Sequence, residues 1–246
     1  MTRESAYKVT YKKRSIPAVV FRLAVVIGGL SNPAKMPCYG FSIPAIYCKV
    51  GSKLRNVVNS VCAICYAMGG FYLMPVVAAA MERRYQIMMQ ALDVWKRNMI
   101  LVLAELNRLR PSDDIGTFFR WHDSGDIQSV EHLESIAEIA RAIPAMAFWL
   151  PTKEIAFLEA FRLRHGNDSI PENLTIRLSV STIGMAPSGL IDHITSKMPQ
   201  VASSGVRTKE QDGNGELCSA YDNDGFCNYC RRCWDATIPH IDYPAH

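Results

Sequence analysis

The chain has 246 residues, of which 49% are hydrophobic and 20% are charged, a composition that is typical of a folded globular protein and excludes a disordered one. Its 27 basic and 23 acidic residues give a net charge of +4, which permits a nucleic-acid partner without arguing for one. The N-terminal residues lack a signal-peptide pattern, and the apolar run at residues 18–29 is interrupted by Arg22 and too short to span a bilayer. We therefore expect a cytoplasmic protein with no membrane partner.

The N-terminal half of the chain predicts few strands. Residues 17–28 are β-branched and apolar, which predicts a strand, and residues 31–74 have scattered Gly, Pro and Cys, which predicts an irregular loop. Residues 76–109 are good helix formers without Pro or Gly. They predict one long helix, or two helices broken near Trp95.

An alternation of strands and helices follows. Strands are predicted at residues 116–122, 145–152 and 173–182, with 198–206 as one further candidate. Helices are predicted at residues 129–143, with Ser129 as the N-cap, and at 153–165. This alternation predicts an α/β fold with mainly parallel strands. We divide the chain into a core of residues 1–210 and a cysteine-rich tail of residues 211–246.

The cysteines of the tail have the spacing of metal ligands. Cys227, Cys230 and Cys233 are separated by two residues each, as in the ferredoxin run that binds 4Fe-4S clusters, and Cys218 supplies a fourth thiol. Structural disulfides are uncommon in the cytoplasm, so a metal role is favoured. Zinc uses the same spacings, and simple packing of the thiols is a further alternative.

The other four cysteines precede residue 66. Cys62 and Cys65 form a pair, and the loop could bring Cys48 back beside them. These three ligands would leave one iron of a 4Fe-4S cluster open to a substrate or cofactor. If Cys38 joins them, that iron is closed; the alternative is that Cys38 packs as a small apolar residue. The sequence leaves open whether there is one cluster or two.

Polar residues follow three of the predicted strands, at the end where parallel sheets place ligands. Ser124, Gly125 and Asp126 follow the first, and Lys153 follows the second. The third ends in SVST (179–182), which contains three hydroxyl residues. Asp126 could accept hydrogen bonds from a ligand amine. The alternative is a local turn with a solvated carboxylate.

Five motifs together resemble the gene product 88 family of uncharacterised phage proteins: SIPAIYC, CAICYAMGG, RWHDSGD, FWLPTKE and CNYCRRCW. The order of the cysteine pair, SGD, PTKE and SVST also resembles the radical S-adenosylmethionine (SAM) superfamily. These resemblances imply a phage origin, and hence the cytoplasm of a host cell. They also imply a partial (β/α) barrel of radical-SAM type.

Carried over by position, the superfamily resemblance makes Cys62 and Cys65 the last two cluster ligands and puts Ile64 against the SAM adenine. Ser124, Gly125 and Asp126 match the segment that binds the SAM amino group, and Lys153 or Arg177 could contact its carboxylate. The superfamily has its first cysteine four residues before the second, whereas Cys48 precedes Cys62 by fourteen.

Two classes of function follow. The first is a radical SAM enzyme of unknown substrate that receives an electron from a reductant protein. The second is a non-catalytic iron–sulfur protein with complete cysteine ligation, acting in electron transfer, redox sensing or partner binding.

Two further patterns carry less weight. His132 matches the His-x-Glu piece of zinc deaminases, but the downstream cysteines lack the required proline, so we expect His132 on a solvated helix face. Basic residues at 8–14, flanked by Tyr7 and Tyr11, and Arg231 with Arg232 suggest nucleic acid weakly; a solvated edge is the alternative.

Overall fold

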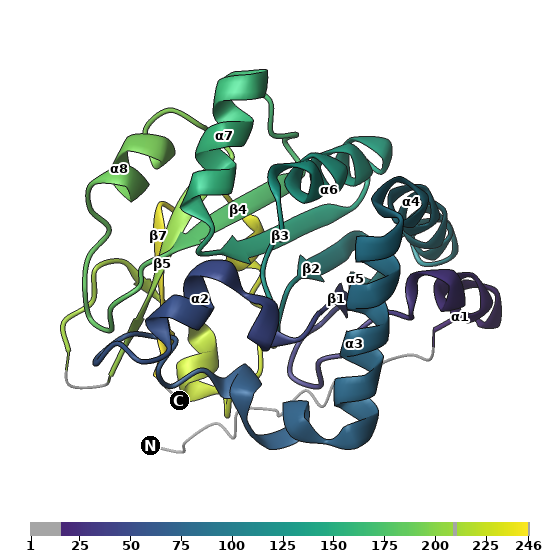
Figure 1. Ribbon diagram of the computed structural model, residues 1–246. Coiled ribbons are helices and arrows are strands. Elements are labelled where there is room, and N and C mark those ends of the chain that lie inside the picture. The colour runs from purple at the N-terminus through teal and green to yellow at the C-terminus, as the bar shows by residue number, and fades with distance from the viewer. Residues whose placement is uncertain (1–15, 209–210, 246) are drawn as a thin grey trace, which may run out of the picture.

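The computed structural model describes residues 16–208 and 211–245. Its centre is a seven-stranded sheet in which every pairing is parallel, with the strand order β1-β2-β3-β4-β5-β7-β6 (Figure 1). The strands are β1 (Gly40–Phe41), β2 (Phe118–Trp121), β3 (Ala147–Thr152), β4 (Leu174–Ser179), β5 (Val201–Arg207), β6 (Glu216–Leu217) and β7 (His240–Pro244). The predicted α/β class with parallel strands is confirmed.

Eight α-helices accompany the sheet in the described ranges. They are α1 (Ala18–Ala24), α2 (Lys49–Leu54), α3 (Pro75–Gln90), α4 (Leu92–Leu109), α5 (Asp114–Thr117), α6 (Val130–Ala142), α7 (Ile155–His165) and α8 (Leu190–Thr195). The Ser129 hydroxyl accepts a hydrogen bond from the amide of His132 at 3.2 Å, which confirms the predicted cap of α6. The helical segment 76–109 is two helices, and the break falls at Ala91 instead of near Trp95.

The prediction of a strand at residues 17–28 is wrong. Val20, Ala24 and Ile27 are buried, and their spacing of four and three residues is the period of a helix that packs one face on the core. The β-branched residues between them, among them Val19 and Val25, remain exposed. Here packing of one face overrides the intrinsic preference of these residues for strands.

The expectation for His132 is also wrong, because α6 packs this side of the helix inward. His132 is buried, and its ring lies 5.4 Å from that of Trp95 on α4. Burial lowers the pKa of His132 to about 3, so the ring is neutral.

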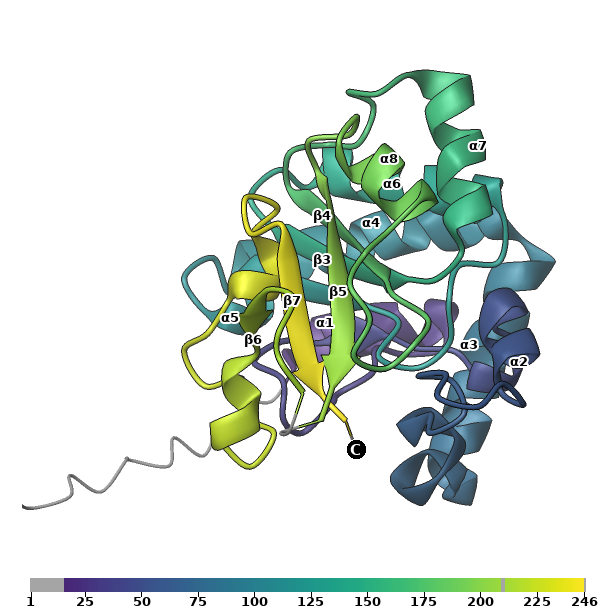
Figure 2. The same cartoon turned by 90° about the vertical axis from the view of Figure 1, so that its left-hand side faces the viewer.

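Helices cover one face of the sheet and the C-terminal segment covers the other (Figure 2). Phe148 and Leu150 of β3 point into the large core beneath the helices. Trp149, between them, packs on the other side with Trp234 and Cys233. Residues 216–244 thus serve as the second covering layer, and they also extend the sheet through β6 and β7.

Arg177 of β4 lies on this second face and is fully buried. Its five N–H donors reach carbonyl oxygens at 2.7–3.3 Å, those of Ser203, Arg232, Cys233, Asp235 and Ile238. Four of these carbonyls belong to the C-terminal segment. The expectation that Arg177 contacts a SAM carboxylate is therefore wrong: its side chain points away from the ligand edge, and its donors are fully used.

No helix in the described residues is both long enough and apolar enough to pass through a membrane.

Candidate functional site

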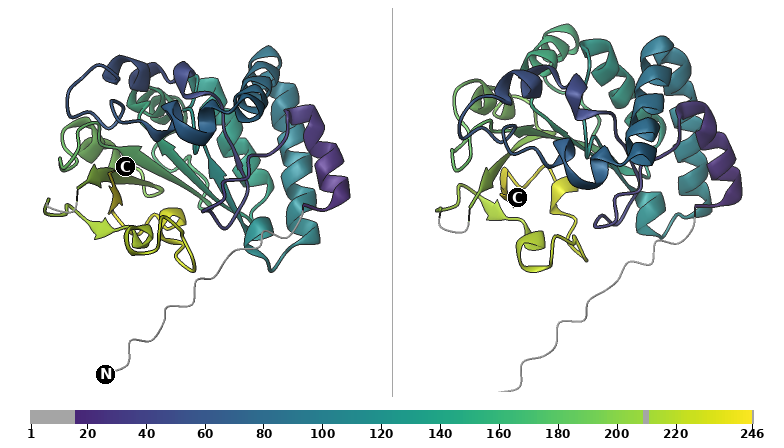
Figure 3. Two further views of the ribbon diagram at one scale, coloured as in Figure 1. Left: turned by 90° about the horizontal axis from the view of Figure 1, so that it is seen from below. Right: turned by 60° about the horizontal axis from the view of Figure 1, so that its bottom comes forward.

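The segment between β1 and α3 crosses the carboxyl ends of the strands (Figure 1). We call residues 42–74 the cysteine loop. Its middle pairs with the chain after β4: Val61 N donates to Ser181 O at 2.9 Å, and Ile183 N donates to Asn59 O at 2.9 Å. The cysteine loop and the C-terminal segment lie on opposite sides of the sheet (Figure 3).

The loops after β2, β3 and β4 meet at one edge, as predicted. Asp126 accepts hydrogen bonds from Thr152 Oγ1 at 2.6 Å and from the Lys153 amide at 2.9 Å. Lys153 Nζ in turn donates to Val180 O at 3.3 Å. These contacts hold the three strand ends together and bring Asp126 and Lys153 to the same place.

Cys48, Cys62 and Cys65 come together beside this edge. Burial raises the pKa of the Cys48 thiol, and the charges of Asp126, Cys65 and Cys62 raise it further. A Cβ at Gly51 would lie only 3.0 Å from Cys48 Cβ and 3.5 Å from Cys62 Sγ. Glycine at this position therefore leaves room for the thiols.

Lys153 supplies a positive charge to the same place. Burial lowers the pKa of its ammonium group, while negative charge on Cys62 and Asp126 opposes that shift. Lys153 also lowers the pKa of Cys62, against the stronger effect of burial, which raises it. The first cysteine group is thus a partly buried set of thiols with one cation beside it.

Glu154 is a residue of this edge that was not predicted from the sequence. Its buried carboxylate accepts hydrogen bonds from the amides of Lys49 at 3.0 Å and Val50 at 2.8 Å. These amides open α2 directly after Cys48, so Glu154 ties the cysteine loop to the end of β3. Its only signal in the sequence was its place after Lys153 in the PTKE motif.

The predicted SAM contacts have other partners here. Ser124 Oγ donates to Ile43 O at 3.0 Å, and a Cβ at Gly125 would meet Ile43 Cγ1 at 2.3 Å, so both residues dock the start of the cysteine loop. Asp126 is buried, and desolvation raises its pKa to about 6 against the hydrogen bonds that it accepts. Ile64 is 43% exposed on the cysteine loop.

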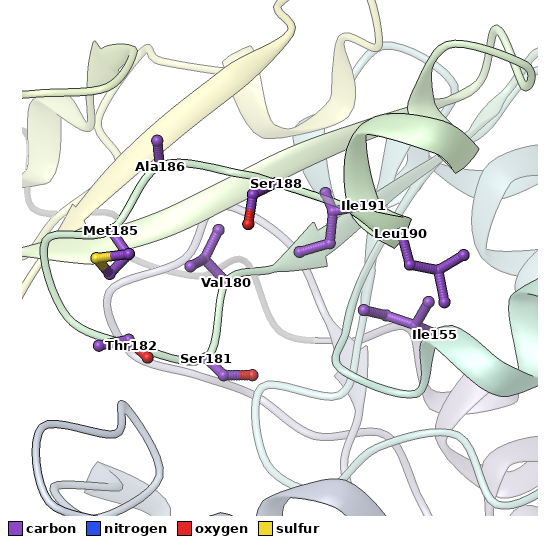
Figure 4. Close-up of a pocket in the computed structure, with 9 residues that line it drawn as sticks. All are labelled: Ile155, Val180, Ser181, Thr182, Met185, Ala186, Ser188, Leu190 and Ile191. Atoms are coloured by element: carbon purple, nitrogen blue, oxygen red, sulfur yellow. The ribbon is translucent and has the colours of Figure 1, made fainter.

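A pocket of about 250 Å³ lies between α7, α8 and the chain after β4 (Figure 4), and one of its lining residues, Val180, accepts the hydrogen bond from Lys153 Nζ. Ser181, Thr182 and Ser188 supply hydroxyl groups to its wall. The other lining residues are apolar: Ile155, Val180, Met185, Ala186, Leu190 and Ile191. The sequence predicted the hydroxyl residues after β4 but not the apolar wall.

The four tail cysteines form the second group. Burial, with a smaller contribution from charge on Cys218, raises the pKa of Cys227 to about 11 and that of Cys233 to about 12. Charge on Cys230 likewise adds to the pKa of Cys227. Cys38 is fully buried in the same cluster of side chains as Cys233. Cys38 therefore lies with the second group and not with the first.

In the described ranges, no three His, Cys, Asp or Glu side chains are arranged to hold a single metal ion. None of the eight cysteines, all of which lie in the described ranges, forms a disulfide.

The basic stretches give little support to nucleic-acid binding. Residues 8–14, with Tyr7 and Tyr11, lie outside the described residues. Arg231 is paired with Asp114 at 2.6 Å, and Arg232 with Glu216 at 3.0 Å.

Comparison with known proteins gives one family. The family model for gene product 88 matches residues 4–240. No curated protein and no solved structure matches the chain.

Proposed function

The chain belongs to the gene product 88 family, and we propose that it is an iron–sulfur protein with a barrel of radical-SAM type that acts as a radical SAM enzyme on an unknown substrate. Cys48, Cys62 and Cys65 would hold a 4Fe-4S cluster with one open iron. The observation that carries this proposal is the separation of the cysteines, because Cys38, which would close the cluster, lies with the other group.

The first cysteine group fits such a cluster. Its thiols are soft ligands, and thiolates in a partly buried place need a compensating cation, which Lys153 supplies. Each thiolate of a four-iron cluster binds a different iron, so the sulfurs stand farther apart than around one ion. The lack of a single-ion arrangement in the described residues is therefore compatible with a cluster.

A bound cluster would supply one electron to the sulfonium of SAM, which breaks a carbon–sulfur bond. The protein's part is to orient SAM and exclude water. The pocket beside Lys153 has apolar walls for a nucleoside and hydroxyl groups for its polar edge. Among the residues matched to the SAM amino group, Asp126 can accept one more hydrogen bond at Oδ2, which accepts one from the Lys153 amide. The Ser124 hydroxyl already donates its hydrogen to Ile43 O.

A reductant protein would reach the cluster through the surface around the cysteine loop. Residues 42–81 contain no Asp or Glu but include Lys49, Lys53 and Arg55. Several apolar side chains are exposed there, among them Val58 and Phe71. An apolar surface with positive charges suits an acidic partner.

The C-terminal group would hold an auxiliary centre through Cys218, Cys227, Cys230 and Cys233. The alternative function is a non-catalytic iron–sulfur protein that does not use SAM. It is favoured by the use of Ser124 and Gly125 to dock Ile43, since this gives the SGD motif a purely structural role.

The test is to measure iron and sulfide per chain, followed by electron paramagnetic resonance (EPR) of the anaerobic, reduced protein before and after adding SAM. About eight irons, with a signal that shifts on adding SAM and is lost in Cys62→Ser, are expected. Bound iron whose EPR signal does not shift on adding SAM would favour the non-catalytic alternative. Bound zinc without iron would contradict both functions. Cys38→Ser is the matched control, expected to keep the SAM-sensitive signal.

A further inference from the structure

A series of side-chain contacts runs from Tyr66, the residue after Cys65 of the first cysteine group, to Cys227 of the second. Tyr66 follows Cys65 directly, and its hydroxyl oxygen accepts a hydrogen bond from Arg120 Nη2 at 3.4 Å. Arg120 Nη1 contacts Met36 Sδ at 3.5 Å, and Cys227 Sγ contacts the same sulfur at 3.6 Å. Three side chains thus bridge from a cysteine of the first group to one of the second.

Arg120 is the centre of this series. It lies on β2, and its guanidinium stacks on the ring of Trp149 at 4.4 Å. Trp149 belongs to the buried cluster that contains Cys38 and Cys233. The Nε–H of Arg120 is buried and has no hydrogen-bond partner in the described part of the chain. A buried donor on a cation, left unpaired beside thiols, suits a site that receives negative charge.

The guanidinium of Arg120 is one side chain away from the second cysteine group, because Arg120 Nη1 and Cys227 Sγ both contact Met36 Sδ. On its other side it reaches Tyr66, the residue that follows Cys65 of the first group. A nearby cation favours the reduced state of an iron–sulfur centre, because reduction adds negative charge.

We propose that Tyr66, Arg120 and Met36 form an electron path between the two cysteine groups, and that Arg120 raises the reduction potentials of both. The inference rests on the proposed function, since it needs a centre in each group. One electron leaves the reduced centre at Cys48, Cys62 and Cys65, which is oxidised by one electron, and reduces the C-terminal centre. A low-potential one-electron donor, which meets the first centre at the cysteine loop, then reduces that centre again, and no bond or proton changes place.

The experiment uses the full chain, reconstituted anaerobically with iron and sulfide, and dithionite as the donor. Redox titration followed by EPR gives both potentials, with Cys62→Ser and Cys227→Ser assigning each signal to its group. In Arg120→Met we expect the equilibrium constant of reduction to fall at least tenfold at both centres, about 59 mV for one electron. Arg120→Lys keeps the charge, so both potentials should return towards the wild-type values.

The path itself is tested by Tyr66→Phe, which removes one hydroxyl and no charge. After mixing with limiting dithionite, rapid-freeze EPR should show slower transfer between the centres with unchanged potentials. Arg108→Met, which removes an exposed cation on α4, is the control and should change neither quantity.

The outcomes separate the two proposals. If neither cysteine group binds iron, the proposed function fails and this inference fails with it. If both bind iron and Arg120→Met shifts only one potential or none, this inference alone is overturned. Should Arg120→Met fail to fold, as judged by circular dichroism, the transfer rate in Tyr66→Phe decides: an unchanged rate overturns the path.

Discussion

At the scale of single residues, Arg177 decides how the C-terminal segment is held. A buried guanidinium with all five donors paired to backbone carbonyls fixes the path of residues 232–238 without a carboxylate partner. Removing it would leave buried carbonyl oxygens unpaired, and this costs more than the bonds contribute.

We therefore expect Arg177→Met to lower the free energy of unfolding by about 3 kcal/mol or more. Chemical denaturation monitored by Trp fluorescence measures the change, since Trp149 and Trp234 lie in the affected layer. Arg108→Met is the matched control: its arginine pairs with Glu105 at the surface and should matter little. Equal stability of the two variants would contradict the role given to Arg177.

The ionisation of Asp126 makes the stability of the folded chain depend on pH. Its pKa in the folded chain is raised to about 6 from 3.8, mainly by burial, so the folded state binds its proton more tightly than the unfolded state does. The proton on Asp126 therefore contributes to the free energy of unfolding fully below pH 3.8, and this contribution of about 3 kcal/mol is lost as the pH rises through 6.

Asp126→Asn does not titrate and should lack this loss. We expect the stability of the iron-free wild type, relative to that of Asp126→Asn, to fall between pH 4 and pH 7. Urea unfolding at four pH values measures it. Parallel curves for the two proteins would show that Asp126 ionises in the fold as readily as in the unfolded chain.

The sequence could predict a site residue only where its contacts did not depend on residues far away in the chain. Asp126 and Lys153 were found because they follow strands, and the topology alone brings strand ends together. Glu154 was missed because its partners, Lys49 and Val50, lie far away in the chain. The contact of Arg120 with Met36 is of equally long range. No local pattern reports such contacts.

At the scale of elements, α2 depends on an anchor outside itself. It has six residues and no side-chain cap, and the Glu154 carboxylate satisfies two of its first amides. So short a helix is not stable alone. The position of Cys48, its N-cap residue, is therefore set by the end of β3.

Glu154→Ala should release this anchor. We expect a loss of about 1–3 kcal/mol in stability, faster hydrogen exchange in residues 49–54, and less iron bound per chain after reconstitution. Glu154→Gln keeps an acceptor oxygen and should restore most of the protection, and Glu172→Ala at an exposed position should have no effect. Unchanged exchange in Glu154→Ala would show that α2 is held by other contacts.

Element prediction failed where burial is one-sided or the element is short. Residues 17–28 look like a strand by composition, but only one helical face of them is buried. β6 has two residues, and β7 follows a cysteine-rich loop with no alternation to mark it. The strands β2 to β5, which carry clear apolar runs between helices, were all predicted.

At the scale of the whole molecule, the C-terminal residues complete the sheet. β7 pairs with β5 on one side and with β6 on the other, and the layer between residues 218 and 239 covers Trp149 and Arg177. A chain cut after residue 210 would expose this apolar face and an unpaired edge of β5.

We therefore expect residues 1–210, expressed alone, to aggregate or to lack cooperative unfolding, even though they carry the first cysteine group and four of the predicted strands. Size-exclusion chromatography and thermal unfolding followed by circular dichroism check this. A monomeric fragment with a cooperative transition would show that the core folds independently, as the division of the sequence at residue 210 suggests.

The place of β7 in the strand order also bears on how the protein folds in time. β7 is the last strand in the chain, yet it inserts between β5 and β6 instead of adding at an edge. β6 pairs only with β7, so it cannot join the sheet before β7 does. During synthesis the second face of the sheet stays open until the ribosome has delivered residues 240–244, and pairings that span so much chain form slowly. The tail thiols therefore reach their final positions only after β7 has paired.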